Sequence, residues 1–171
     1  FRVSEPELKA AHDGLEPGLL ASLRKAIANV RDYQEKIRIK PIADWQTPEG
    51  AVLGVRYRPL NRVGVCVPGA SAPLPSTVIM TVVPAQVAGV KETAVISAPR
   101  FNGNIHPVIL GVCYELGVTD VYRISGAQAV AALAFGTEHI KKVDKIVGPS
   151  NIWGQLAKKE VFGLVDIDSF A

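Results

Sequence analysis

The chain has 171 residues, of which 48% are hydrophobic and 20% are charged, and its formal net charge is +3. These values are ordinary for a globular protein and exclude a disordered or low-complexity chain, and the length indicates one domain, alone or with an appendage. Lys and Arg residues are scattered, which argues against nucleic-acid binding. We expect the densest cluster, Lys158-Lys159 with Lys141-Lys142 upstream, to be the solvated face of a helix.

The apolar runs and the cysteines indicate the cellular compartment of the protein. The most apolar stretch, 78–90, is too short to span a bilayer, so no membrane partner is expected. Cys66 and Cys113 both lie in apolar runs and form neither a disulfide framework nor a zinc-binding spacing. A reducing, cytoplasmic setting is therefore predicted.

Two helices are predicted near the N-terminus. Ser4-Glu5-Pro6-Glu7 fits a capping box with proline in the first turn, which predicts a helix over 5–14. Apolar residues then recur at intervals of three and four and predict an amphipathic helix over 17–37. The stripe that they form consists of Leu20, Leu23, Ile27 and Val30. We expect this stripe to be covered from outside the chain, in a dimer or by swapping.

Strands and helices alternate in the rest of the chain. A strand is predicted over 51–58, and a turn at 59–61 leads to a second strand over 62–67. Further short strands are predicted over 93–98, 120–124 and 144–147, and "LVDID" is strand-like. Helical patterns cover 75–89, 104–116, 127–135 and 151–162. Because the strands from 63 onward start about 24 to 30 residues apart, as in βαβ units, we predict an α/β fold with a parallel sheet covered by helices.

Four loops rich in small residues follow the strands of this predicted sheet. They are "PGASAPLPST", "SAPRFNG", "SGAQ" and "GPSN". Right-handed crossovers bring them to the sheet edge formed by the carboxyl ends of the strands, where ligands bind. Each loop leads into a helix whose first N–H groups are unpaired. This indicates a site for an anionic or polar ligand, a nucleotide above all, although the G-x-G-x-x-G fingerprint is missing.

Three residues at this edge are candidates for binding. Gln128 lies in the first turn of a predicted helix, where its amide would either contact a ligand or tether the loop. Asn151 begins the last helix, and spacing alone favours an N-cap role, for which Ser150 competes. Cys66 ends its strand near a helix N-terminus, as a nucleophile would, but no partner base is placed near it. A small buried hydrophobic residue is therefore the favoured interpretation of Cys66.

The three histidines are isolated in the sequence. His12, His106 and His139 form no i,i+4 pair and no spacing typical of a carboxylate triad. We therefore expect no metal site made within this chain and no acid–base dyad.

Long segments of the chain resemble the histidinol dehydrogenase family. They are "NRVGVCVPGASAPLPSTVIMTVVPAQVAGV", "SGAQAVAALAFGTEHIKKVDKIVGPSNIW" and "AKKEVFGLVDIDSFA". The resemblance is strong over 62–171 and weak before about residue 50, and its combination of motifs is specific. It implies an enzyme that oxidises L-histidinol to L-histidine with two hydride transfers to NAD. It also implies a zinc-dependent homodimer.

The resemblance further implies a domain organisation. Family members have two related, incomplete Rossmann-like domains. Residues 62–171 correspond to the one that binds NAD, and residues 1–61 correspond to part of a first domain that is split. The expected fold is therefore an incomplete Rossmann-like parallel sheet with helices on both faces, preceded by an α-helical segment and a strand pair.

The NAD contacts of the family fall on three positions of this sequence. The Gln of the GAQA motif is Gln128, and the Asn of the GP-x-N motif is Asn151. The third contact in the family is a Tyr two residues before PG, where this chain has Cys66, so an aromatic contact with the cofactor is lost. Ser150 stands where GP-x-N usually has Gly.

The resemblance also implies that the chain is a fragment. The family's catalytic Glu-His pair, its zinc ligands and its substrate-contacting residues would follow Ala171, so no catalytic or metal-binding residue is expected within the chain. A different class stays open, namely a standalone domain that binds a nucleotide or a protein partner without catalysis. The alcohol substrate also stays open, because relatives of the family oxidise other alcohols.

Overall fold

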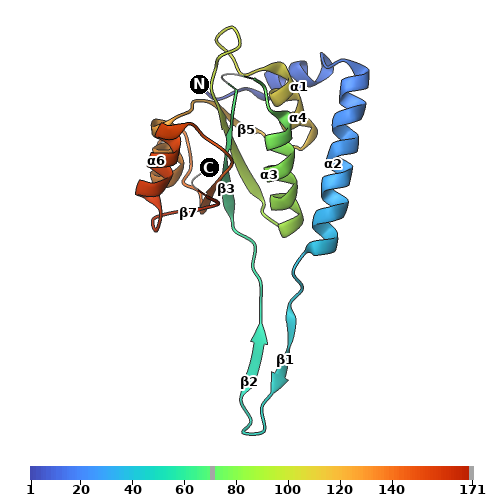
Figure 1. Ribbon diagram of the computed structural model, residues 1–171, viewed down its shortest axis with the longest axis vertical. Coiled ribbons are helices and arrows are strands. Elements are labelled where there is room, and N and C mark those ends of the chain that lie inside the picture. Colours follow the sequence, from blue (N-terminus) through green and yellow to red (C-terminus); the bar gives the residue numbers. More distant parts are fainter. Residues whose placement is uncertain (70–71, 170–171) are drawn as a thin grey trace.

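A computed structural model describes residues 1–69 and 72–169. A parallel sheet lies between two groups of helices, and a two-stranded hairpin projects far from this body (Figure 1). Parts of the predicted "PGASAPLPST" loop and of the IDSFA motif, at 70–71 and 170–171, lie outside the described residues.

The sheet has five parallel strands in the order β5-β4-β3-β6-β7. Their bounds are Arg62–Val67 for β3, Glu92–Ser97 for β4, Asp120–Arg123 for β5, Lys145–Val147 for β6 and Asp166–Ile167 for β7. All six residues of β3 are buried, as expected for a central strand covered on both faces. The chain moves outward from β3 to β5 and then crosses to β6 on the other side of β3, so the strand order reverses between β3 and β6.

Helices cover both faces of the sheet, which confirms the predicted fold class. One face carries α3 (Pro75–Ala88) and α4 (Pro107–Glu115), which pack against α2 (Pro17–Ile37) and α1 (Glu5–Asp13) respectively. The other face carries α5 (Ala127–Phe135) and α6 (Ile152–Val161). Each face has its own apolar core.

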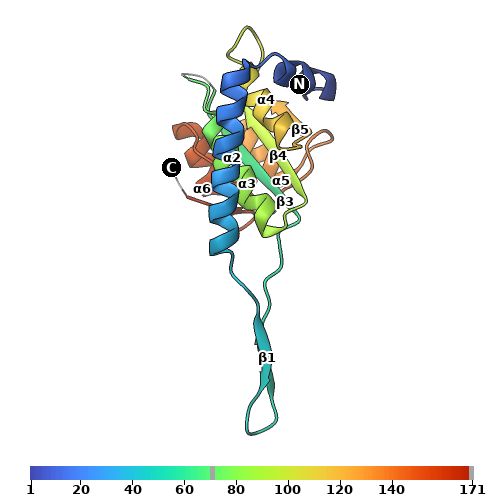
Figure 2. The same cartoon turned by 90° about the vertical axis from the view of Figure 1, so that its right-hand side faces the viewer.

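The two N-terminal helices are part of the body. The predicted capping box is present, since the Glu7 carboxylate accepts the backbone N–H of Ser4 at 3.0 Å. Figure 2 shows α2 lying along α3, where Leu23 is buried and Ile27 and Val30 pack against the same core. Three of the four stripe residues are therefore covered within the chain, contrary to the expectation of cover from outside, while Leu20 is half-buried and lies outside this core.

The strand pair is an antiparallel hairpin of β1 (Ile42–Gln46) and β2 (Val52–Val55). A strand pair before the sheet is therefore confirmed. Strand β2 falls within the predicted strand 51–58, but the sequence did not locate its partner β1. The predicted turn at 59–61 is an irregular connection to β3. All five residues of β1 are exposed, so no alternation of buried and exposed positions marks this strand.

Candidate functional site

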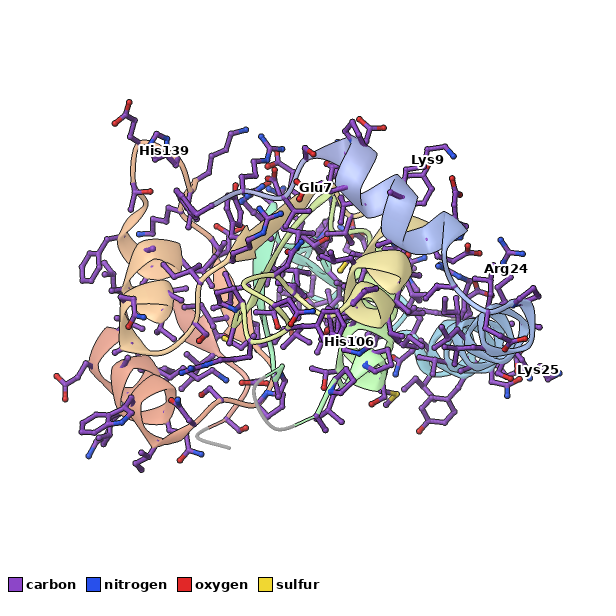
Figure 3. The ribbon with its side chains drawn as sticks, turned by 90° about the horizontal axis from the view of Figure 1, so that it is seen from above. Glu7, Lys9, Arg24, Lys25, His106 and His139 are labelled. Atoms are coloured by element: carbon purple, nitrogen blue, oxygen red, sulfur yellow. The ribbon has the colours of Figure 1, made fainter. Side chains whose placement is uncertain are left out.

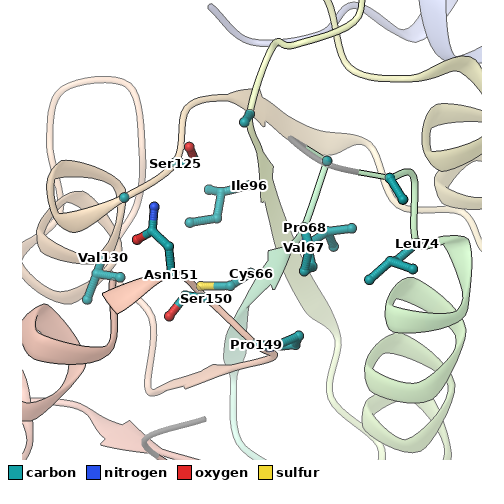
Figure 4. Close-up of a pocket in the computed structure, with 14 residues that line it drawn as sticks. Cys66, Val67, Pro68, Leu74, Ile96, Ser125, Val130, Pro149, Ser150 and Asn151 are labelled. Atoms are coloured by element: carbon teal, nitrogen blue, oxygen red, sulfur yellow. The ribbon is translucent and has the colours of Figure 1, made fainter. Parts of the chain in front are cut away.

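The four predicted loops meet around a pocket of about 360 Å³, a volume typical of small-molecule sites (Figure 4). The pocket lies at the carboxyl ends of β3 and β6, where the strand order reverses and where ligands bind in open α/β sheets. Its lining consists of Cys66, Val67, Pro68, Gly69, Ala72, Leu74, Ile96, Ala98, Ser125, Gly126, Val130, Pro149, Ser150 and Asn151.

The lining is mostly apolar. None of the described residues that line the pocket is Asp, Glu, Lys or Arg, and the polar side chains are those of Ser125, Ser150 and Asn151. Such a surface suits an uncharged group with apolar faces, such as a nucleoside, better than an isolated anion. The loops alone suggest an anionic ligand, but the described lining of the pocket has no cationic side chain to pair with one.

Asn151 lies at the start of α6 and projects into the pocket region (Figure 4). Its Oδ1 accepts the backbone N–H of Gly154 at 3.0 Å, which confirms the predicted N-cap role. Ser150 does not compete for that role, since its buried Oγ has no hydrogen-bond partner in the described part of the chain. The Asn151 Nδ2 makes no hydrogen bond within the described residues, so the amide can cap the helix and still donate to a ligand.

Gln128 lies beside the pocket. Its side chain is exposed in the first turn of α5, and the described lining residues do not include it. It folds back over Gly126, where an added Cβ would lie 3.2 Å from Gln128 Oε1. Gly126 has a φ of 77°, and no described side chain caps α5. The first N–H groups of α5 are therefore open next to the pocket and next to the Gln128 amide.

Cys66 lies in the floor of the pocket, and its side chain is buried. Burial raises the pKa of its thiol to about 11, while Lys158 lowers it and Asp168 raises it through their charges. The thiol is thus protonated at neutral pH, which excludes an activated nucleophile and supports the interpretation as a small hydrophobic residue. Gly148 crosses directly over this position, because a Cβ added to it would lie 2.3 Å from the Cys66 carbonyl oxygen.

Sequence reasoning missed Lys158 and Asp168, which lie beneath the loop after β6. The Lys158 side chain is fully buried, so the prediction of a solvated face is wrong for this residue, although Lys159 is exposed. Lys158 Nζ donates to the Gly148 carbonyl at 2.6 Å and to Asp168 Oδ1 at 2.8 Å. Lys158 lies one turn after the buried Gly154 on α6, but the sequence marks neither residue as buried.

The three histidines lie apart. Figure 3 shows His106 near α4 and His139 on the far side of the sheet, and His12 bonds Glu115 through Nε2 at 2.7 Å. Among residues 1–69 and 72–169, no group of three or more His, Cys, Asp or Glu residues could hold a metal ion. Within the same residues, no helix is long and apolar enough to cross a membrane.

Comparison with known proteins identifies the family. The sequence model of histidinol dehydrogenase matches residues 1–171. The chain belongs to the histidinol dehydrogenase family. It is 50% identical over 172 residues to the histidinol dehydrogenase of Geobacillus kaustophilus (strain HTA426), with 100% of this chain and 40% of that protein covered. It is 49% identical over 171 residues to the histidinol dehydrogenase of Rhodopirellula baltica, with 100% and 37% covered.

A crystal structure supports the same conclusion. The histidinol dehydrogenase from Elizabethkingia anophelis matches with a TM-score of 0.93 and 36% sequence identity, over 99% of this chain and 39% of that chain. The chain thus spans about 40% of the length of the histidinol dehydrogenases that it matches. The resemblance seen in the motifs is confirmed, and the relatives are oxidoreductases.

Proposed function

We propose that this chain supplies the NAD-binding part of an enzyme that oxidises L-histidinol to L-histidine, in histidine biosynthesis. The observation that carries the proposal is the apolar pocket at the point where the strand order reverses, in a chain of the histidinol dehydrogenase family. NAD, when bound, accepts the hydride in each of two successive oxidations. The residues of this chain bind and orient it.

Three residues contact the cofactor in this proposal. Asn151 donates from Nδ2 while its Oδ1 keeps the cap of α6. Gln128 adds an amide next to the open first turn of α5. Cys66 forms part of the floor, where a larger aromatic residue would fill some of the pocket.

The described residues fit a dinucleotide but do not fit a zinc ion. The pocket offers apolar walls for a nucleoside and neutral polar groups at its rim. No described cluster of ligating side chains suits a metal, so we place the zinc ligands of the intact enzyme outside this chain and derive no step through zinc.

We also propose the wider organisation of the protein. Residues 62–171 form the Rossmann-like NAD-binding domain, and residues 1–61, whose helices pack on that domain, also contribute to a first domain that further chain completes. The intact enzyme is a homodimer in the cytoplasm. Exposed apolar residues on the hairpin, such as Trp45 and Val52, support a contact with further protein.

Calorimetric titration with NAD tests the site residues. The double variant Gln128→Ala/Asn151→Ser removes both amides, and Ser at 151 retains an N-cap oxygen, so α6 keeps its cap. We expect the Kd for NAD to rise about tenfold or more, which corresponds to about 1.4 kcal/mol. Gln46→Ala, which removes an exposed amide from the hairpin, is the matched control. Equal NAD affinity in the wild type and the double variant would count against these two residues.

Assay of the 171-residue chain with L-histidinol, NAD and zinc tests the assignment of catalysis to other parts of the enzyme. We expect no NADH to form, because a base is needed to take the hydroxyl proton and the proposal places that base outside the chain. Zinc-dependent production of NADH by the purified chain would refute this assignment.

A further inference from the structure

An ion pair whose lysine is fully buried lies directly beneath the loop that forms one wall of the pocket. Lys158 on α6 has a fully buried side chain, and its Nζ lies 2.8 Å from Oδ1 of Asp168, just after β7. Strands β6 and β7 are parallel neighbours, so their carboxyl ends lie at the same edge of the sheet. This arrangement brings Asp168 beside Gly148, the first residue after β6.

The ion pair binds both backbone polar groups of Gly148. Lys158 Nζ donates to the Gly148 carbonyl at 2.6 Å, and Asp168 Oδ2 accepts the Gly148 N–H at 2.7 Å. Hydrogen bonds with a charged partner are stronger than neutral ones. Pro149, Ser150 and Asn151 follow Gly148 directly and line the pocket. The pair therefore holds the residue at which this wall of the pocket begins.

Gly148 has little room to move toward the sheet. Its φ is 94°, and an added Cβ would lie 2.3 Å from the Cys66 carbonyl oxygen. Release of Gly148 would therefore move the loop away from the floor of the pocket. Such a shift would displace Asn151, whose Nδ2 makes no hydrogen bond within the described residues and can donate to a ligand.

A second Lys–Asp pair nearby, between strands β6 and β7, shows that this geometry is particular to Lys158. Lys145 and Asp166 also lie 2.8 Å apart, but their side chains are 30% and 54% exposed, and they bond no part of the loop. In the first pair, Lys158 is 0% exposed and Asp168 is 33% exposed. Burial of a charged pair is weak evidence for stability, because apolar replacements are often as stable. Stability alone therefore does not account for a lysine buried at this position.

We propose that the Lys158–Asp168 pair holds residues 148–151 in the conformation that binds the cofactor, which makes both of them positioning residues for NAD. Neither residue lines the pocket, so the pair acts through the loop. This inference rests on the proposed function and adds that the ion pair fixes the conformation of one wall of the NAD site.

The test compares NAD affinity and loop protection in matched variants of the protein. Lys158→Met removes the cation, and Lys158→Met/Asp168→Asn removes both charges, which avoids leaving a carboxylate unpaired. Lys145→Met removes the exposed pair and is the control. Calorimetry measures the Kd for NAD, and hydrogen exchange measures the protection of the Gly148 amide. We expect the Kd to rise about tenfold in both Lys158 variants, with faster exchange at Gly148, and both values to be unchanged in the control.

A double-mutant cycle separates positioning from general stability. In an Asn151→Ser background, Lys158→Met is expected to weaken NAD binding by much less than in the wild type, because the group that the pair positions is already absent. The inference would be overturned if the losses of NAD affinity from Lys158→Met and Asn151→Ser were additive. It would also be overturned if Lys158→Met/Asp168→Asn folded and bound NAD with the wild-type Kd. A wild-type protein that binds no NAD would overturn the proposed function, whereas unchanged exchange at Gly148 in the Lys158 variants would overturn this inference alone.

Discussion

Cys66 and Lys158 show what the sequence reveals about single residues at this site. The burial of Cys66 follows from its place in an apolar strand, and the structure agrees. The burial of Lys158 runs against the usual solvation of lysine, and only its partners, Asp168 and the Gly148 carbonyl, make it acceptable. Those partners come from elements that meet only in the folded sheet, so residue type alone could not predict the pair.

The two thiols are expected to be inert in the native protein. Burial raises the pKa of Cys66 to about 11 and that of Cys113 to about 12, so neither forms a thiolate at about pH 8. Titration with a disulfide reagent is expected to label neither thiol in native protein and both in denaturant. Rapid labelling of native Cys66, located by mass spectrometry, would contradict this prediction.

Asp168 is expected to make stability depend on pH. Burial by itself would raise the pKa of its carboxyl, but hydrogen bonds from Lys158 and from the Gly148 and Ser169 N–H groups outweigh burial and hold it below 3.8. A carboxyl whose pKa is lower in the folded state stabilises the fold at pH values above its pKa in the unfolded state. This stabilisation is lost as the pH falls through the pKa of the folded state. Urea unfolding should therefore show a larger cost of Asp168→Asn at about pH 6 than at about pH 3. Glu138→Gln, which changes an exposed carboxylate, is the control, and an equal cost of Asp168→Asn at both pH values would contradict the expectation.

Among the helices and strands, the sequence predicts positions best where burial of one face imposes a regular spacing of apolar residues. The strands of the parallel sheet and the helices α2 and α5 lie close to their predicted positions. Prediction fails for β1, whose exposed residues have no apolar face to pack. Helix α4 begins at Pro107 rather than 104, because the segment Phe101–Asn104 forms its own backbone bridge and His106 is the N-cap.

Helix α2 offers a test of packing between elements. Leu23 is buried where α2 meets α3, whereas Leu19, one turn earlier on the same helix, is 37% exposed. We expect Leu23→Ala to lower the free energy of unfolding by about 2 kcal/mol and Leu19→Ala to lower it by about 0.5 kcal/mol or less. Denaturant titration measures both, and equal effects would mean that α2 is not held on the body.

At the scale of the molecule, the body and the hairpin are held by different means. The body has two apolar cores, one on each face of the sheet. Strand β1, by contrast, makes its extensive contacts with β2. The edge of the sheet at which the pocket lies follows from the predicted βαβ pattern, but the strand order that places it between β3 and β6 was not predicted. The apolar character of its walls depends on which residues face inward, and the sequence pattern did not show that.

Limited proteolysis tests the independence of the hairpin. Arg38 and Arg56 are exposed in the segments that join the hairpin to the body, and neither is followed by proline, which would block trypsin. Trypsin is expected to cut first at these sites, because exposed connecting segments are preferred sites of cleavage. Mass spectrometry of the early fragments identifies the cuts, and a first cut within β3 to β6 would contradict this expectation.

The position of the hairpin in the chain indicates that the polypeptide can be broken there without loss of the body. Helices α1 and α2 precede it, and the whole sheet follows it, yet the two parts contact each other extensively through α1 with α4 and α2 with α3. The covalent link through the hairpin is therefore not what joins them. Residues 1–37 and 62–171, produced as two separate polypeptides, are expected to assemble into one body, so the protein can be divided here for fragment complementation.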